Sequence, residues 1–376
     1  MTSGITGLGG TRESSKITHD TALHAIESAI PVRLPDGRNI VTKEQLGKGE
    51  VGGRIAASWL GQVLGHTYGR HQLTSSVDEI EEQIRSGKIE PIFIEKNGEP
   101  DACAALIHGA HTVEIGRAAN APQGGGGAVL MWRLARVWEK RQDDSRPLVA
   151  EIRMAAPFDG IDGGQGSQAT LLHLQKVGMV PHAFLPAFHH PGKIGHDRQE
   201  IFCFASKEKK GHESARLAPS FIHLPEAQQM NIGLLQNLLG MNGFETQICL
   251  SEQEKIPLRH PIGRIASVPF HLLTVDPEQI MKGEIDWDWD VGSSNSPFEL
   301  LPIDARCSDL AKLSNELIHQ GFICAGISAP HEGPLHLLFA RLHKTTLAPT
   351  QPIKEFPGIR ERDIMNLHQQ FASAMV

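Results

Sequence analysis

Tyrosine is almost absent from the sequence: its 376 residues include one, Tyr68, beside 20 histidines. A reaction that needs a phenol therefore has a single candidate. The five cysteines stand alone, without a CxxC pair. This excludes a zinc ribbon and is typical of reduced thiols in a cytoplasmic protein. No apolar run reaches the ~18 residues of a membrane span, and the Gly/Ser/Thr-rich start lacks a hydrophobic leader, so we expect no membrane partner.

An excess of positive charge is also missing. Lys and Arg number 36 against 43 Asp and Glu, which leaves a net charge of −7. Such a chain has no general attraction for polyanions, and we expect no nucleic-acid partner. With 40% hydrophobic residues the chain can bury ordinary cores. At about 150 residues per domain, its length predicts two or three domains.

Hydrophobic periodicity predicts an α/β (α+β) protein. The predicted helices are 51–63, 76–86, 128–141 and 167–177, and the predicted strands are 91–95, 102–108, 111–119, 148–154 and 199–206. Composition then suggests an N-terminal extension (1–50), a main unit (51–207), a charged linker (208–218) and a C-terminal α/β domain (219–376).

Two parts of the chain look alike. A predicted helix runs into Val177-Gly178-Met179-Val180, and another runs into Gln320-Gly321-Phe322-Ile323. Each is followed by an extended segment and a return strand. Because helix–Gly–strand is a common unit, the pattern leaves both internal duplication and coincidence open.

The most informative segment lies between the strand at 111–119 and the following helix. Gln123 is followed by four glycines and Ala128. Glycines at a helix start leave backbone N–H groups open, and the helix dipole adds positive potential, so this is a possible site for a pyrophosphate. It is neither a Walker loop nor a Rossmann fingerprint, because the required Lys and glycine spacing are missing. A plain flexible loop is the alternative.

Gln123-x-x-Gly126-x-Ala128 resembles the Arg/Gln-x-x-Gly-x-Gly/Ala acetyl-CoA signature of the GNAT N-acetyltransferase superfamily. The order of predicted elements over about residues 51–207 is similar to that family, and the segment around Ser167-Gln168 is most similar to beta-lysine N-acetyltransferase-like members. The resemblance implies a mixed sheet, splayed between the strands near Val113 and Val149 and flanked by helices. If the two look-alike segments are a true duplication, the C-terminal domain is a degenerate GNAT-like half; otherwise it is an accessory α/β domain.

The resemblance further implies acetyl-CoA as co-substrate. Its pyrophosphate would lie on the amides of the glycine segment, and its pantetheine would pair with the preceding strand. The cofactor-binding residues so expected are Arg117, Ala118, Ala119, Gln123, Gly124, Gly125, Gly126, Gly127 and Ala128.

Transfer to an amine needs a base for its proton and an acid for the departing thiolate. Glu114 is the first candidate base and Glu151, across the implied splay, the second; ion pairs with Arg117 and Arg153 are the alternatives. The family's usual acid is a Tyr four residues before the helix-ending Gly, and here Leu174 stands there. The neighbouring His173 is a weak substitute, because one helical residue turns a side chain by about 100°.

Other clusters predict less. His189, His190, His196 and Asp197 favour a substrate-lining or structural role over a metal site, since adjacent residues on a strand point to opposite faces. The glycine-rich loop 160–166 lacks the ligands of a calcium site. We expect no metal. The Trp–Asp alternation at 286–290 is compatible with an edge strand or with a binding edge for a cationic ligand.

These observations predict a cytoplasmic CoA-dependent N-acyltransferase that acts on a small-molecule amine or amino acid. An enzyme that takes a longer acyl-CoA, or an acyl carrier protein, is the alternative within the class. Because the usual Tyr is missing, a non-catalytic CoA-binding sensor or scaffold is the alternative outside it. A homodimer is left open.

Overall fold

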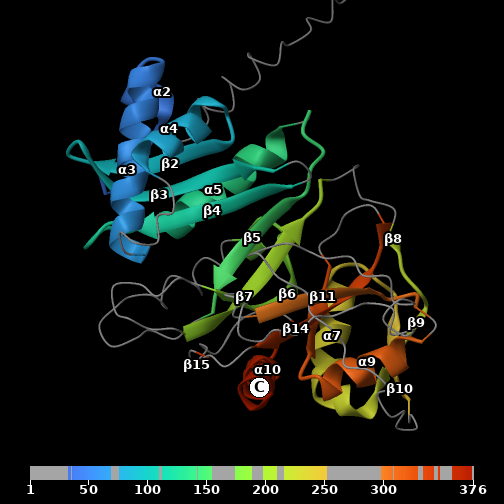
Figure 1. Ribbon diagram of the computed structural model, residues 1–376. Coiled ribbons are helices and arrows are strands. Elements are labelled where there is room, and N and C mark those ends of the chain that lie inside the picture. The colour runs from blue at the N-terminus through green and yellow to red at the C-terminus, as the bar shows by residue number, and fades with distance from the viewer. Residues whose placement is uncertain are drawn as a thin grey trace, which may run out of the picture.

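One large sheet organises the molecule in the computed structural model (Figure 1). The structure describes residues 33–34, 36–68, 76–109, 112–141, 143–154, 174–188, 198–209, 216–251, 298–307, 309–328, 333–342, 346–347 and 358–374. Eleven described strands form the sheet, in the order β1-β2-β3-β4-β5-β7-β6-β12-β14-β11, and β15 (Thr346–Leu347) pairs with β7. Both parallel and antiparallel neighbours occur, so the mixed α/β class expected from the sequence is confirmed.

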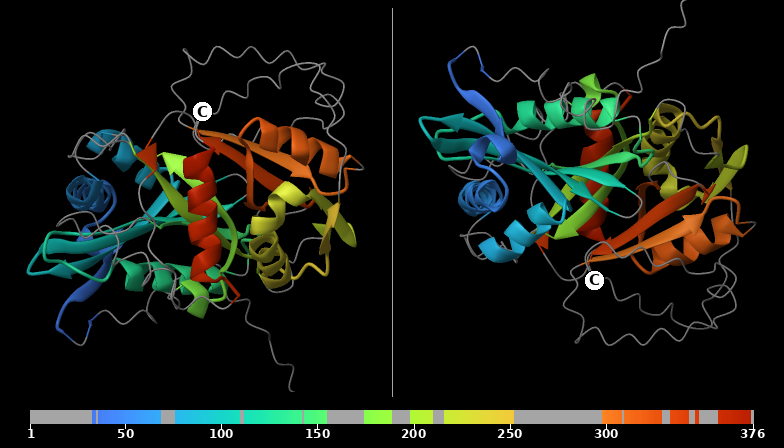
Figure 2. Two further views of the ribbon diagram at one scale, coloured as in Figure 1. Left: turned by 90° about the horizontal axis from the view of Figure 1, so that it is seen from below. Right: turned by 90° about the horizontal axis from the view of Figure 1, so that it is seen from above.

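The N-terminal part of the sheet is antiparallel and has helices on both faces (Figure 2). Its strands are β1 (Asn39–Thr42), β2 (Ile89–Lys96), β3 (Glu99–His108) and β4 (Val113–Asn120). One face is covered by α3 (Glu50–Tyr68) and α4 (Val77–Arg85), with α2 (Lys43–Leu46) leading into α3, and the other by α5 (Gly127–Lys140).

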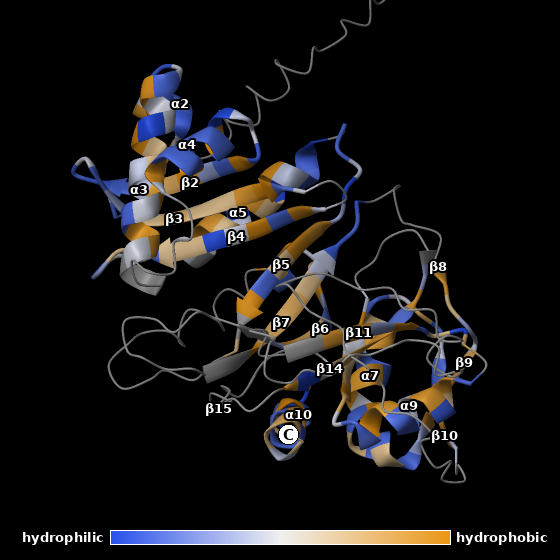
Figure 3. Ribbon diagram, in the orientation of Figure 1, coloured by the Kyte–Doolittle hydropathy of each residue, from blue (hydrophilic) through white to orange (hydrophobic). Residues whose placement is uncertain are grey.

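α3, α4 and α5 begin within one residue of the predicted helix starts, and α4 and α5 end within one residue of the predicted ends, whereas α3 continues to Tyr68. Ser76 caps α4 by accepting the N–H of Glu79 at 3.3 Å, while the Glu79 carboxylate accepts the N–H of Ser76 at 2.6 Å, which is a capping box. Ile80 and Ile84, four residues apart, are fully buried, and apart from the exposed Val77 the rest of α4 is polar or charged, so that the helix is mostly hydrophilic (Figure 3). On α5 the predicted apolar face is buried as well: Met131, Leu134, Ala135 and Trp138.

The sheet splays between β4 and β5 (Leu148–Arg153). These two strands are parallel and paired over three positions, the last of which joins Ile115 to Ala150. Beyond that pair β4 continues beside β3, whereas β5 continues beside β7 (Arg198–Lys207), and the two diverge (Figure 1). The splay between the strands near Val113 and Val149, expected from the sequence, is therefore present.

The two look-alike segments have the same local structure. Gly178 and Gly321 have φ of +82° and +81°. The N–H of each residue that follows, Met179 or Phe322, donates to the carbonyl of Leu174 or Leu317, both at 3.1 Å or less. These are the hydrogen bonds of a Schellman helix end, for which glycine is suited.

The surrounding strands repeat too. After the first glycine come β6 (Val180–Phe188) and β7; after the second come β12 (Ile323–Ile327) and β14 (His336–Leu342). β7 lies between β5 and β6, and β14 lies between β11 (Phe298–Asp304) and β12, all antiparallel. Both β6 and β12 carry an irregularity at the same place, before Ala183 and before Gly326. The sequence echo thus corresponds to a structural repeat.

The two repeats join edge to edge. β6 pairs with β12 through Ala183 and Gly326, which are equivalent positions of the two repeats, so a local two-fold relation passes through this pair. A Cβ on Gly326 would overlap Cα and Cβ of Ala183, so glycine is required for so close an approach. His182, buried beside this joint, bonds through Nδ1 to the carbonyl of Ile327 at 3.0 Å.

Further elements cover the second repeat. They are η1 (Glu226–Gln228), α7 (Gln229–Met241), α9 (Leu310–His319), α10 (Glu361–Ser373), the pair β9 (Phe221–Pro225) and β10 (Gln247–Ser251), and the pair β8 (Arg216–Leu217) and β13 (Gly333–Pro334). Asn231 of α7 bonds to Gln370 of α10 at 2.8 Å, which ties these helices together. Among the described helices none is long and apolar enough to cross a membrane.

Candidate functional site

Glu114 and Glu151 lie on the same face of the sheet. Glu114 is paired with Ile107 of β3 and with Val149 of β5, and directly paired residues share a face. Glu151 is two residues beyond Val149, and residues two apart on a strand also share a face. Their neighbours Ile115 and Ala150 point the other way, into the core beneath α5. Both carboxylates are therefore on the face that carries α3 and α4.

The two carboxylates meet where the splay begins. Glu151 is the first residue of β5 past the last β4–β5 pair, and Gly116 is its counterpart on β4. A Cβ on Gly116 would overlap Oε1 of Glu114, so the Glu114 carboxylate occupies the space above Gly116. Adjacent strands are about 5 Å apart. The site therefore holds two acidic groups side by side at the apex.

β4 is bulged immediately after this point. Arg117 has φ of +52°, and with Ala118 it opposes the single residue Ala104 of β3. The Cys103 thiol donates to the carbonyl of Arg117 at 3.3 Å, and Ala119 returns to the ladder as a buried residue. A bulge leaves one backbone residue without its ladder partner, which turns polar backbone groups of Arg117–Ala118 away from β3.

Burial dominates the electrostatics of the two carboxylates. It raises the pKa of Glu114, and the nearby Arg117 guanidinium partly opposes this. Burial, together with the charge of Glu114, raises the pKa of Glu151 to about 8. Within the described residues no ion pair joins Glu114 to Arg117, and Nε of Arg117 is buried without a hydrogen-bond acceptor.

The glycine segment is a shaped turn at the start of α5, and two of its glycines are required sterically. At Gly124 a Cβ would overlap the Asp101 carbonyl oxygen. Gly126 has φ of +112°, and its Cβ would overlap Cδ1 of Ile94. By contrast Gly125 has open space around it. This excludes a merely flexible loop.

The amides of this turn divide into two groups. The N–H of Gly124 donates to Ala121 at 2.8 Å, and the N–H of Gly127 donates to Oδ1 of Asn120 at 2.9 Å. Among the described residues no acceptor is present for the N–H groups of Gly125 and Gly126. Open amides at the positive end of a 14-residue helix form an anion site.

Two residues that position the turn were missed by sequence reasoning. Nη1 of Arg38 donates to the carbonyl of Gly125 at 2.6 Å and pairs with the Asp101 carboxylate. The backbone carbonyl of Asp101 in turn accepts the N–H of Ala121 at 2.9 Å. Arg38 comes from the region before β1, where composition suggested only an extension, and no local pattern marks it.

Several predicted residues add little to the site. Gln123 is exposed, with φ of +63°. Leu174, where the family's usual Tyr would stand, is fully buried in the core. His173, His189, His190, His196 and Asp197 and the segments 160–166 and 286–290 lie outside the described residues.

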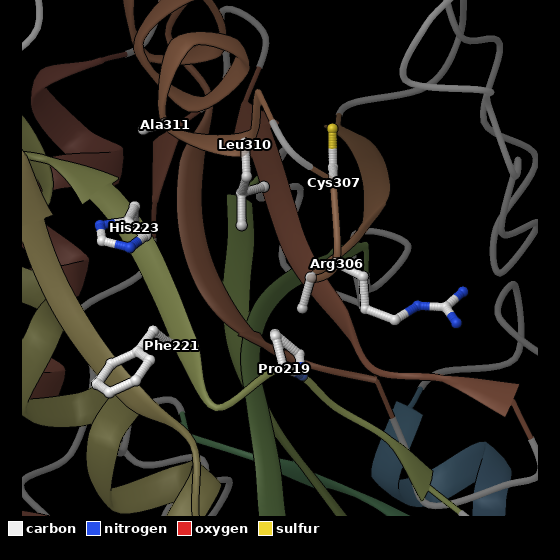
Figure 4. Close-up of a pocket in the computed structure, with 8 residues that line it drawn as sticks. Pro219, Phe221, His223, Arg306, Cys307, Leu310 and Ala311 are labelled. Carbon is white, nitrogen blue, oxygen red and sulfur yellow. The ribbon is translucent and has the colours of Figure 1, made fainter.

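A pocket of about 200 Å³ lies in the second repeat, far along the sheet from the splay (Figure 4). It is lined by Phe221 and His223 of β9, by Arg306 and Cys307 after β11, and by Leu310 of α9. Arg306 is held by Asp304, with Nη2 and Oδ2 2.7 Å apart, and no carboxylate lines the pocket. It therefore lacks the paired carboxylates of the splay, and the imidazole of His223 is its candidate base.

No family model and no curated protein matches the chain. Solved structures of acetyltransferases are similar to part of the chain. A GNAT-family acetyltransferase from Streptococcus pneumoniae is 12% identical over 46% of this chain and 99% of that one, with a TM-score of 0.32. An N-acetyltransferase from Staphylococcus aureus is 19% identical over 46% of this chain and 99% of that one, with a TM-score of 0.31.

A third similar structure is a proposed acetyltransferase from Salmonella typhimurium, solved with acetyl-CoA as its cofactor. It is 18% identical over 49% of this chain and 98% of that one, with a TM-score of 0.32. At such identities and scores the likeness by itself assigns neither a family nor an activity to the chain.

Proposed function

We propose that the chain is a CoA-dependent N-acyltransferase of the GNAT superfamily, which transfers acetyl from acetyl-CoA to the amine of a small molecule. One observation carries this proposal: the paired carboxylates of Glu114 and Glu151 lie at the apex of a splay, beside a glycine turn that offers open amides. Neither feature is needed to build the sheet. The beta-lysine-like assignment stays a prediction.

The residues at the splay suit a CoA thioester. The open amides of Gly125 and Gly126 would receive the pyrophosphate at the start of α5, with Gln123, Gly124 and Gly127 shaping the turn. The bulged strand at Arg117–Ala119 would offer backbone groups to the pantetheine. One of its backbone N–H groups would also donate to the oxyanion that develops on the thioester carbonyl. When bound, the thioester supplies an activated acyl group.

The acceptor follows from the same geometry. Two acidic groups in a half-buried place favour a cationic or amine-bearing molecule over an anion. Glu114 is the base: the Arg117 guanidinium favours its ionised form, and it can take a proton from the attacking nitrogen. The acceptor is thus a small amine or amino acid, bound on the face that carries α3 and α4.

Binding and turnover test this proposal separately. Thermal-shift titration should show stabilisation of the protein by acetyl-CoA, growing with ligand concentration. Release of CoA thiol, measured against a panel of mono- and diamines, should then identify an acceptor. Glu114→Gln should lower kcat by about 10²–10⁴-fold, the usual contribution of a general base.

The matched control is Glu139→Gln, which removes a carboxylate of α5 that pairs with Lys207 on the surface. It should keep the wild-type rate. No stabilisation by acetyl-CoA would overturn the proposal, and equal rates for Glu114→Gln and wild type would overturn the assignment of the base.

One observation favours a second candidate. The buried Leu174 supplies no acid at the position where the resemblance expects one. A non-catalytic CoA-binding sensor would therefore bind acetyl-CoA without transferring acetyl to any amine of the panel. If longer acyl-CoAs stabilise the protein more strongly than acetyl-CoA, the donor is a longer acyl group.

A further inference from the structure

Glu151 lies beside Glu114 at the splay, and the proposed function leaves it without a role. It is the first residue of β5 that is not paired with β4, it lies on the face shared with Glu114, and its neighbour across the splay is Gly116. Because Gly116 has no side chain, Glu114 is the one side chain of β4 beside Glu151 in the splay, where a thioester would enter. Its partner on β7 is Phe204, which carries no charge.

No cation neutralises Glu151 within the described part of the chain. The charged groups that face Glu151 are Glu114 and, beyond Glu114, Arg117. Three further titratable residues have side chains outside the described part of the structure: Arg153 of β5, and His66 and Tyr68 near the end of α3. Burial and the charge of Glu114 raise the pKa of Glu151 to about 8, so it holds its proton at pH 7. Two neighbouring carboxyl groups with different environments divide naturally into an acid and a base.

The internal repeat shows that the fold does not require a carboxylate here. Glu151 pairs with Phe204 as Pro302 of β11 pairs with Leu338 of β14. Phe204 and Leu338 are themselves equivalent, since they pair with Ala183 and Gly326. The second repeat thus builds the same strand with a proline, and the acidic group is particular to the splay.

We propose that Glu151 is the general acid of the transfer and protonates the sulfur of the departing CoA, with Glu114 as the base; this rests on the proposed function. The nitrogen of a neutral amine attacks the thioester carbon, so a C–N bond forms and the C–S bond breaks. Glu114 takes the proton from nitrogen, and the carboxyl O–H of Glu151 passes to sulfur. A proton then returns from Glu114 to Glu151, directly or through water, and the site is reset.

The experiment compares leaving groups. Glu151→Gln and Glu114→Gln are assayed with the best amine of the panel and two donors: acetyl-CoA, and the acetyl thioester of nitrothiophenol, whose thiolate leaves without protonation. With acetyl-CoA both variants should lose about 10²-fold or more. With the aryl thioester Glu151→Gln should lose less than about fivefold, whereas Glu114→Gln should lose the same large factor.

Two further measurements separate chemistry from folding. Glu151→Gln should bind acetyl-CoA like the wild type in thermal shift, and Glu151→Asp, which keeps the proton on a shorter arm, should have an intermediate rate. The wild-type kcat with acetyl-CoA should fall above pH 8, and Glu151→Gln should lose this limb. Equal losses with both donors, or no loss with acetyl-CoA, would overturn the role of Glu151 alone. A wild type that transfers to no amine would overturn the proposed function as well.

Discussion

Gly126→Ala is the most direct test of the glycine turn. Gly126 is the residue before α5, with φ of +112°, a conformation that L side chains rarely adopt. The added methyl group would also overlap Cδ1 of Ile94, a fully buried side chain of β2. Both effects act on the native state before any ligand is bound.

The expected cost can be worked out from these two terms. A non-glycine residue at such a φ costs about 1–3 kcal/mol, and overpacking a core by one methyl group about 1–3 kcal/mol. Reduced freedom of the unfolded chain returns about 0.4–1 kcal/mol. We expect a net loss of about 2–4 kcal/mol in the free energy of unfolding. The matched control Gly125→Ala, with open space around the new methyl, should stay within about 1 kcal/mol of wild type.

The assay is urea unfolding followed by tryptophan fluorescence, because Trp138 is fully buried on α5 and reports on this helix. Acetyl-CoA stabilisation is then measured for each variant, and Gly126→Ala should show the smaller shift. If Gly126→Ala and Gly125→Ala unfold at the same urea concentration, the turn is not constrained in the way described. If Gly126→Ala is less stable but acetyl-CoA stabilises it as much as the wild type, the pyrophosphate binds elsewhere.

Three further perturbations test other parts of the structure. Although burial alone would raise it, hydrogen bonds from His108 and Arg141 lower the pKa of Glu90 to about 2, so its stabilisation is complete above pH 4.5 and is lost as the pH falls toward 2. Because the Glu90 side chain is 38% exposed, solvent screens part of this interaction. Glu90→Gln should therefore lower the free energy of unfolding by about 1–2 kcal/mol at pH 7 and by less at pH 3, as urea unfolding would show; an equal loss at both pH values would refute this. Gly326→Ala should destabilise by about 3 kcal/mol because of the overlap with Ala183, whereas Gly240→Ala, in open space on α7, should be neutral or stabilising; chemical denaturation decides. Burial raises the pKa of the Cys103 thiol to about 12, so native protein at pH 8 should be alkylated at half-buried Cys249 and spared at Cys103, as peptide mass spectrometry would show.

Local patterns predicted the parts of the site that depend on neighbours in sequence. Alternation along a strand predicts that Glu114 points away from Val113 and Ile115, and apolar spacing placed α5 after the glycines. The contact of Arg38 with Asp101 and Gly125 spans 63 and 87 residues. It could not be predicted, because an exposed arginine near a turn has the same local pattern whether or not it reaches such partners.

The bulge at Arg117 was equally hidden, since it arises from packing: β4 must leave β5 while staying paired with β3. Arginine is not among the residue types enriched at positive φ, so the sequence does not mark this position. The helix–Gly–strand echo was visible, by contrast, because a Schellman end needs its glycine locally at both Gly178 and Gly321.

The repeat also explains why the paired carboxylates occur at one place among the described residues. An apex of diverging strands needs a second strand beside β5, and β4 provides it together with Glu114 and the turn into α5. β11, the equivalent of β5, is the last strand of the sheet among the described residues and carries Pro302 where Glu151 would stand. The second repeat therefore copies the supporting strands without the pair of carboxylates. The second repeat contributes at β6, because its strand β12 covers the edge of β6. Without β12, that edge would be open to pairing with another chain.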